Sequence, residues 1–86
     1  MNINDLISIV KKKLEQNFKI ENIKIEDKSF LHKKHANNQV GKFHLKLNIN
    51  SDELKKLSRI DSNKKIYKVL NTELKEYIHS IQILIN

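Results

Sequence analysis

Residues 42–50, Lys-Phe-His-Leu-Lys-Leu-Asn-Ile-Asn, alternate between apolar and polar side chains without a fault. Successive side chains of a β-strand point to opposite faces of a sheet, so a strict period of two predicts a strand with one buried face and one solvated face. The apolar face carries Phe43, Leu45, Leu47 and Ile49, and the polar face carries Lys42, His44, Lys46 and Asn48. A chain with this segment must therefore build a sheet that is covered mainly on one side.

Two longer segments have the period of amphipathic helices. The first predicted helix spans residues 4–17, and Asn2 or Asn4 can cap its start. Its apolar positions are Ile3, Leu6, Ile7, Val10 and Leu14. The second long helix is predicted over residues 60–76, with Ile60, Tyr67, Leu70 and Leu74 on one face and Ile66 and Val69 beside them. Both helices can cover the apolar face of the sheet.

The remaining segments complete the predicted order of elements. Residues 20–27 alternate as a short strand, and residues 78–86 are rich in isoleucine and end the chain as a third strand. Residues 28–41 have no period and contain the single glycine, which predicts a loop. Ser51 starts a short helix that ends near Leu57. The predicted order is α-β-β-α-α-β, an α+β fold with a three-stranded mixed sheet and helices on one face.

Chain length, cysteine content and the N-terminal segment limit the class of protein. The 86 residues suffice for one small domain, predicted over residues 1–86, and no cysteine is present to form a disulfide. The N-terminal segment is amphipathic and carries Asp5, which is unlike a signal peptide, and no apolar run is long enough to span a bilayer. These features predict a cytoplasmic protein without a membrane partner.

The chain is basic, with 17 Lys and Arg residues against 10 Asp and Glu residues and a net charge of +7. Two explanations remain open: an anionic partner such as nucleic acid, or the Lys, Asn and Ile bias of an AT-rich coding sequence. If nucleic acid is the partner, the start of the second long helix is the candidate surface. Its candidate phosphate-binding residues are Arg59, Lys64, Lys65 and Lys68.

Four histidines are the other candidate functional residues, because imidazole is the commonest metal ligand in proteins. His32 and His35 lie in the predicted loop, where they are either solvated side chains or part of an incomplete metal site. His44 lies between two lysines on the polar face of its strand, which predicts a surface residue. By period two, His79 shares a face with Ile81 and the apolar residues that follow, which predicts a core residue unless it lies at the rim of the sheet.

Catalytic motifs are missing from the sequence. No cysteine nucleophile, no Gly-x-Ser-x-Gly elbow and no glycine-rich phosphate loop can be found, and the acidic residues are scattered. We therefore expect a protein that is not an enzyme.

The order and spacing of several short motifs resemble the BolA-like family over about residues 3–85. No single motif is unique to the family, but their combination is specific. The matching motifs are Asp27-x-Ser29-x-x-His32-x-x-His35-Ala36, the strand from Phe43 to Ser51 with Leu54, Ser58-Arg59-Ile60, Ile66-Tyr67-x-x-Leu70, Glu73-Leu74 and Ile78-His79-Ser80-Ile81. The resemblance implies a fold similar to a class II KH domain, in agreement with the predicted order of elements.

The resemblance implies first a role in iron–sulfur chemistry. BolA-like proteins pair with monothiol glutaredoxins and share a [2Fe–2S] cluster, in iron–sulfur delivery or iron regulation. The glutaredoxin and its glutathione supply thiolates, and the BolA-like partner supplies a histidine from an Ile-His-Ala-Leu stretch, which corresponds to His79. The second ligand comes from the loop between the first two strands, at His32 with His35 next to it. Histidine is sound chemistry for one iron of such a cluster, so the missing cysteine removes nothing essential.

The resemblance implies secondly a role in transcription, because some family members are DNA-binding regulators. This chain departs from the family there: Ser62-Asn63-Lys64 stands where Arg-His-Arg is common, and Lys42-Phe43 stands where His-Phe often opens the second strand. The glycine-rich loop of true KH domains is also absent. These departures weaken direct reading of nucleic acid more than they weaken the cluster hypothesis.

Overall fold

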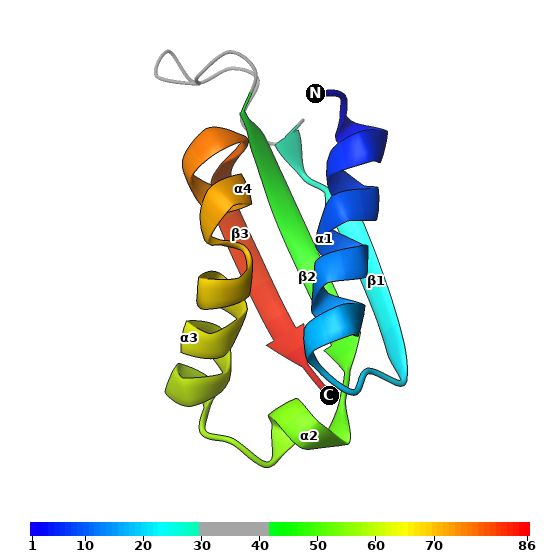
Figure 1. The fold of residues 1–86 in the computed structure, drawn as a ribbon, viewed down its shortest axis with the longest axis vertical. Coiled ribbons are helices and arrows are strands. Elements are labelled where there is room, and N and C mark those ends of the chain that lie inside the picture. The colour runs from blue at the N-terminus through cyan, green and yellow to red at the C-terminus, as the bar shows by residue number, and fades with distance from the viewer. Residues whose placement is uncertain (30–41) are drawn as a thin grey trace.

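The computed structural model describes residues 1–29 and 42–86, and their elements follow the predicted order with one change (Figure 1). The elements are α1 (Ile3–Asn17), β1 (Asn22–Asp27), β2 (Phe43–Asn50), α2 (Asp52–Lys55), α3 (Arg59–Val69), α4 (Asn71–Glu76) and β3 (Ile78–Ile85). The change is that the second long helix is divided into α3 and α4. Among the described residues, no helix is long and apolar enough to cross a membrane.

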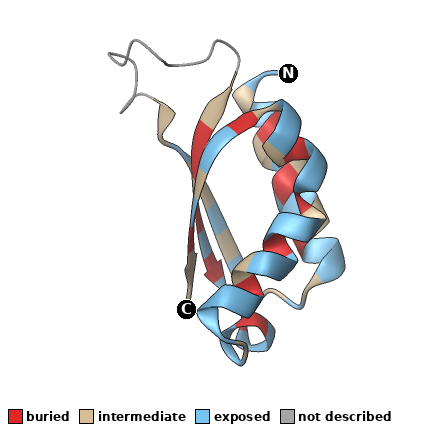
Figure 2. Cartoon of the chain, turned by 90° about the vertical axis from the view of Figure 1, so that its left-hand side faces the viewer, coloured by how far each residue is buried: buried red, intermediate tan, exposed pale blue. Residues whose placement is uncertain are grey.

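The strands form a mixed sheet in the order β1-β2-β3. β1 pairs antiparallel with β2, and β2 pairs parallel with β3, so β2 lies at the centre. All helices of the described residues lie on one side of this sheet, and none of them covers the other side, which we call the open face (Figure 2). The predicted α+β fold is confirmed, whereas its likeness to a class II KH domain stays a prediction.

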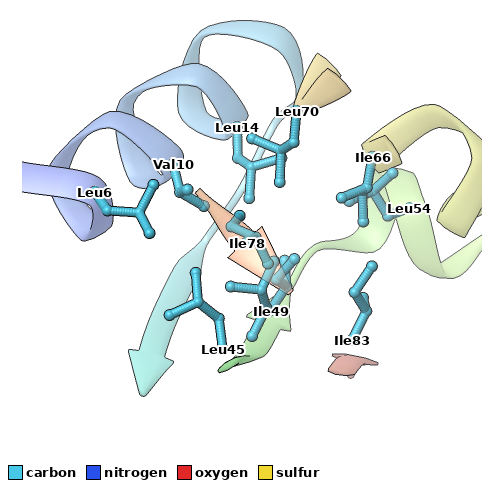
Figure 3. Packing of buried hydrophobic residues seen from close by; sticks show 11 residues of the cluster. Leu6, Val10, Leu14, Leu45, Ile49, Leu54, Ile66, Leu70, Ile78 and Ile83 are labelled. Carbon is cyan, nitrogen blue, oxygen red and sulfur yellow. The ribbon is translucent and has the colours of Figure 1, made fainter. Parts of the chain in front are cut away.

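The core lies between the helices and the covered face of the sheet. Alternation in β2 places Leu45, Leu47 and Ile49 on that face, where each is at most 2% exposed. They pack against the apolar stripe of α1, as Figure 3 shows for several of these side chains. The buried residues of α1 are Leu6, Val10 and Leu14, and the Asn2 side chain accepts a hydrogen bond from the Asp5 N–H at its start. Asn2, and not Asn4, is thus the cap.

The predicted apolar face of the second long helix is wrong at two positions. Ile60 and Tyr67 are 66% and 46% exposed, and the buried residues of α3 are Ser62 and Ile66. The helix is interrupted at Leu70, so the positions before and after this residue do not continue one face. Ser62 can occupy the buried side because its hydroxyl donates a hydrogen bond to the Arg59 carbonyl at 3.0 Å. The exposed Ile60 and Tyr67 therefore belong to the surface of α3.

Candidate functional site

A β-bulge at the start of β3 determines where His79 lies. Phe43 pairs with Ile78, but the next residue of β2, His44, pairs with Ser80, so His79 is an extra residue in β3. An extra residue breaks the alternation of faces along a strand. His79 is exposed, and its ring contacts the ring of His44 on the polar side of β2. The prediction of a core residue is wrong for this physical reason, and the alternative, a reachable residue at the rim of the sheet, is confirmed.

His44 lies on the open face of the sheet, as the alternation predicts, but it is not a surface residue. It is only 4% exposed. Its Nδ1 lies 2.6 Å from the Ser80 Oγ, its ring centroid lies 4.9 Å from that of His79, and its backbone N–H donates to the Ser29 Oγ at 3.1 Å. The prediction of a surface residue is therefore wrong, because Ser80 and His79 of β3 contact this buried side chain.

We call His44, His79 and Ser80 the histidine cluster. Beside it, the open face has a hollow of about 340 Å³, lined by side chains that include Lys28, Lys46 and Gln82. Glu26 on β1 pairs in register with Lys46, and a hydrogen bond from Lys24, together with the charge of Lys28, lowers the pKa of the Glu26 carboxyl. The open face around the histidine cluster therefore combines imidazole, hydroxyl and ammonium groups.

The predicted loop ligands, His32 and His35, lie outside the described residues. The described residues on either side of residues 30–41 form hydrogen bonds close to the histidine cluster. Ser29 bonds to the His44 backbone at 3.1 Å, and the Phe43 N–H donates to the Tyr77 carbonyl at 2.9 Å. The chain therefore leaves and re-enters the described structure beside His44 and the start of β3.

The described residues of the histidine cluster do not by themselves supply a complete metal site. Within residues 1–29 and 42–86, no three His, Asp or Glu side chains gather as metal ligands. A structural zinc site usually needs four protein ligands. One accessible imidazole, that of His79, is a chemically suitable ligand for iron, and the remaining ligands must come from elsewhere. The described residues thus fit a group that is held partly by other ligands.

The candidate phosphate-binding residues on α3 are all exposed, but they do not form one patch. Lys68 is a neighbour of both Lys64 and Lys65 on the helix surface, at spacings of four and three residues. Arg59 lies apart from them, in a groove of about 330 Å³ between the start of α3 and the end of β3. Lys65 and Lys68 instead line a hollow beside Phe18 at the end of α1. The structure therefore brings the three lysines together and separates Arg59 from them.

Sequence reasoning missed the apolar part of this surface. Ile60 and Tyr67 are exposed and lie four and three residues from Lys64, so they are its neighbours on the helix. Their exposure could have been predicted from helix geometry. On an ideal helix, Ile60 and Ile66 do not point to the same side, so a helix that buries Ile66 exposes Ile60.

Comparisons with known proteins agree with this architecture. A family model described as BolA-like protein matches residues 14–86. The chain is 29% identical over 75 residues to a protein of Haemophilus influenzae named DNA-binding transcriptional regulator BolA, and the match covers 87% of this chain and 70% of that protein. Among solved structures, it is similar to the BolA domain of SufE1 from Arabidopsis thaliana, with 26% identity and a TM-score of 0.79 over 100% of this chain and 93% of that one. BolA1 from the same plant has a TM-score of 0.75 at 23% identity, over 92% and 87% of the two chains, which shows a shared fold.

Proposed function

The chain belongs to the BolA-like family, and on this premise we propose that it is a non-enzymatic adaptor that binds a monothiol glutaredoxin and shares a [2Fe–2S] cluster with it. The observation that carries the proposal is the exposed imidazole of His79, which a β-bulge displaces from the core to the rim of the open face. The role of the complex is delivery of iron–sulfur clusters or regulation by iron. The proposal places the protein in the cytoplasm, as the sequence predicts.

In this proposal the chain supplies histidine ligands and the partner supplies thiolates. The glutaredoxin cysteine and its glutathione bind through sulfur, while the neutral imidazole of His79 donates a nitrogen lone pair to iron. His32 is the proposed second ligand, with His35 as the alternative. Support for a loop ligand comes from Ser29, which lies three residues before His32 in the sequence. The Ser29 hydroxyl accepts a hydrogen bond from the backbone N–H of His44, so this part of the chain is held beside the histidine cluster.

The experiment mixes the purified chain with a monothiol glutaredoxin, ferrous iron, sulfide and glutathione. We expect an absorption and circular dichroism spectrum that differs from that of the glutaredoxin homodimer. His79→Ala should abolish this difference, whereas Gln16→Ala, an exposed change on α1 away from the open face, should preserve it. A mixed spectrum that is unchanged by His79→Ala would contradict the ligand assignment. His32→Ala and His35→Ala, made separately, identify the loop ligand.

A second candidate function is DNA binding, as in a transcriptional regulator of the BolA type. Two observations support it: the name of the Haemophilus influenzae relative and the exposed lysines of α3. Lys64, Lys65 and Lys68 are suited to phosphates, and the adjacent Ile60 and Tyr67 offer apolar contact to bases. Arg59 is the weaker member of the predicted set, because it lines a different groove.

DNA binding through this surface should depend steeply on salt. Each phosphate-binding lysine that is removed should reduce the slope of log K against log salt by about one. We expect this reduction for Lys64→Ala and Lys65→Ala, measured by fluorescence anisotropy with labelled duplex DNA, and no comparable change for Lys12→Ala on the exposed side of α1. If the double variant Lys64→Ala and Lys65→Ala bound DNA with unchanged affinity and salt dependence, DNA binding through this surface would be refuted.

A further inference from the structure

We infer that Ser80 and His44 act together as positioning residues for His79. They hold its imidazole in the orientation in which it would bind the iron of the shared cluster. This inference deepens the proposed function and rests on it for the identity of the bound group. It concerns two side chains that neither the family resemblance nor the comparisons assign to any role. Its basis is the geometry of the histidine cluster.

The first step is the bond between Ser80 and His44. These residues are register partners across the parallel β2–β3 pair, and the Ser80 Oγ lies 2.6 Å from the His44 Nδ1. A hydrogen bond at this distance to a ring nitrogen fixes the rotation of the imidazole about its own axis. The corresponding family stretch is Ile-His-Ala-Leu, whose alanine has no hydroxyl, so this bond comes from the serine of this chain.

The second step is the contact between the two rings. The His44 and His79 centroids lie 4.9 Å apart, with the planes tilted by 58°. His44 is 4% exposed and therefore cannot move freely, whereas His79 is exposed. The fixed ring of His44 blocks part of the space through which the His79 side chain would otherwise rotate. The bulge brings His79 to this fixed ring, and the contact restricts its rotamers.

The third step is the consequence for binding. An exposed side chain that must become ordered when it binds a metal loses conformational entropy, and a side chain ordered beforehand loses less. Residues that orient a metal-binding histidine affect metal affinity by roughly 10–100-fold when they are changed. Because His44 orients His79 by packing and not by a direct hydrogen bond, we expect an effect of about tenfold, at the lower end of this range.

The decisive variant is Ser80→Ala, because Ser80 is exposed and its loss leaves the core intact. In the free protein, side-chain NMR couplings of His79 should report one dominant rotamer. In the Ser80→Ala variant, the couplings of both His44 and His79 should instead report averaging between rotamers. Ser80→Thr retains the hydroxyl and should restore the single rotamer. Gln16→Ala, an exposed change on α1 away from the open face, is the control and should change neither histidine. This measurement needs neither iron nor glutaredoxin.

In the cluster-loaded complex, Ser80→Ala should alter the histidine nitrogen hyperfine couplings of the reduced cluster and speed cluster loss to a chelator by about tenfold. Ser80→Thr should restore both. If His79→Ala changes the mixed spectrum but Ser80→Ala changes neither the rotamers nor cluster retention, the positioning inference alone is overturned. If His79→Ala leaves the mixed spectrum unchanged, the proposed function fails and the inference fails with it. The two failures are therefore distinguishable.

Discussion

Among the Asp, Glu, Lys and Arg side chains of the described residues, Glu73 of α4 is the only buried one, and it is paired with Lys13 of α1. The Lys13 Nζ lies 2.7 and 3.0 Å from the two Glu73 carboxylate oxygens. Burying a carboxylate without a partner is unfavourable, so Lys13 offsets the cost of burying Glu73 and links α4 to α1. The sequence indicated Glu73 only as part of a family motif, because its burial depends on a residue 60 positions away.

Removing the lysine alone should therefore destabilise the fold. We expect Lys13→Met to lower the free energy of unfolding by about 1–2 kcal/mol, less than for a fully buried pair because the Lys13 side chain is 37% exposed. The double change Lys13→Met and Glu73→Met should recover most of the loss, since no buried charge remains. Urea denaturation measures both. Lys24→Met is the control, because the Lys24 side chain is 71% exposed in its pair with Glu26. Equal effects of the two lysine changes would refute the argument.

At the scale of elements, the sequence predicted those helices and strands that depend on interactions between residues close together in the chain. The alternation of residues 43–49 and the apolar stripe of α1 both appear in the structure, as does the start of α2 at Ser51. The bulge at His79 could not be predicted, because it arises from the pairing of β3 with β2. The interruption at Leu70 was not predicted either, because no glycine or proline lies near it in the sequence.

Two serine caps offer a test of how tertiary contacts add to a local signal. The Ser51 hydroxyl accepts from the Leu54 N–H and donates to the Lys19 carbonyl at 2.7 Å, and Ser51 is 1% exposed. The Ser58 hydroxyl only accepts from the Asp61 N–H, at an exposed position. Ser51→Ala should lower the free energy of unfolding by about 2 kcal/mol and Ser58→Ala by about 1 kcal/mol or less. Chemical denaturation of both variants checks this order, and the reverse order would show that the Lys19 bond contributes nothing.

At the scale of the molecule, the two candidate surfaces lie on opposite sides of the sheet. The helices cover one face (Figure 2), and the lysines of α3, which belong to this helical layer, are exposed. The histidine cluster lies on the open face. The sequence placed the candidate residues on these elements, but the arrangement of the two surfaces follows from the topology. The predicted loop ligands lie outside the described residues and stay predictions.

This separation implies that the two candidate activities can be changed independently. Substitutions at distant sites with no shared contacts usually have additive effects. His79→Ala should therefore leave the salt dependence of DNA binding unchanged, and Lys64→Ala with Lys65→Ala should leave the cluster spectrum with glutaredoxin unchanged. Combining all three changes should give the sum of the separate effects, measured by anisotropy and circular dichroism on the same preparations. If the lysine changes instead weaken glutaredoxin binding, the partner extends around the edge of the sheet onto α3, and a bound glutaredoxin would then compete with DNA.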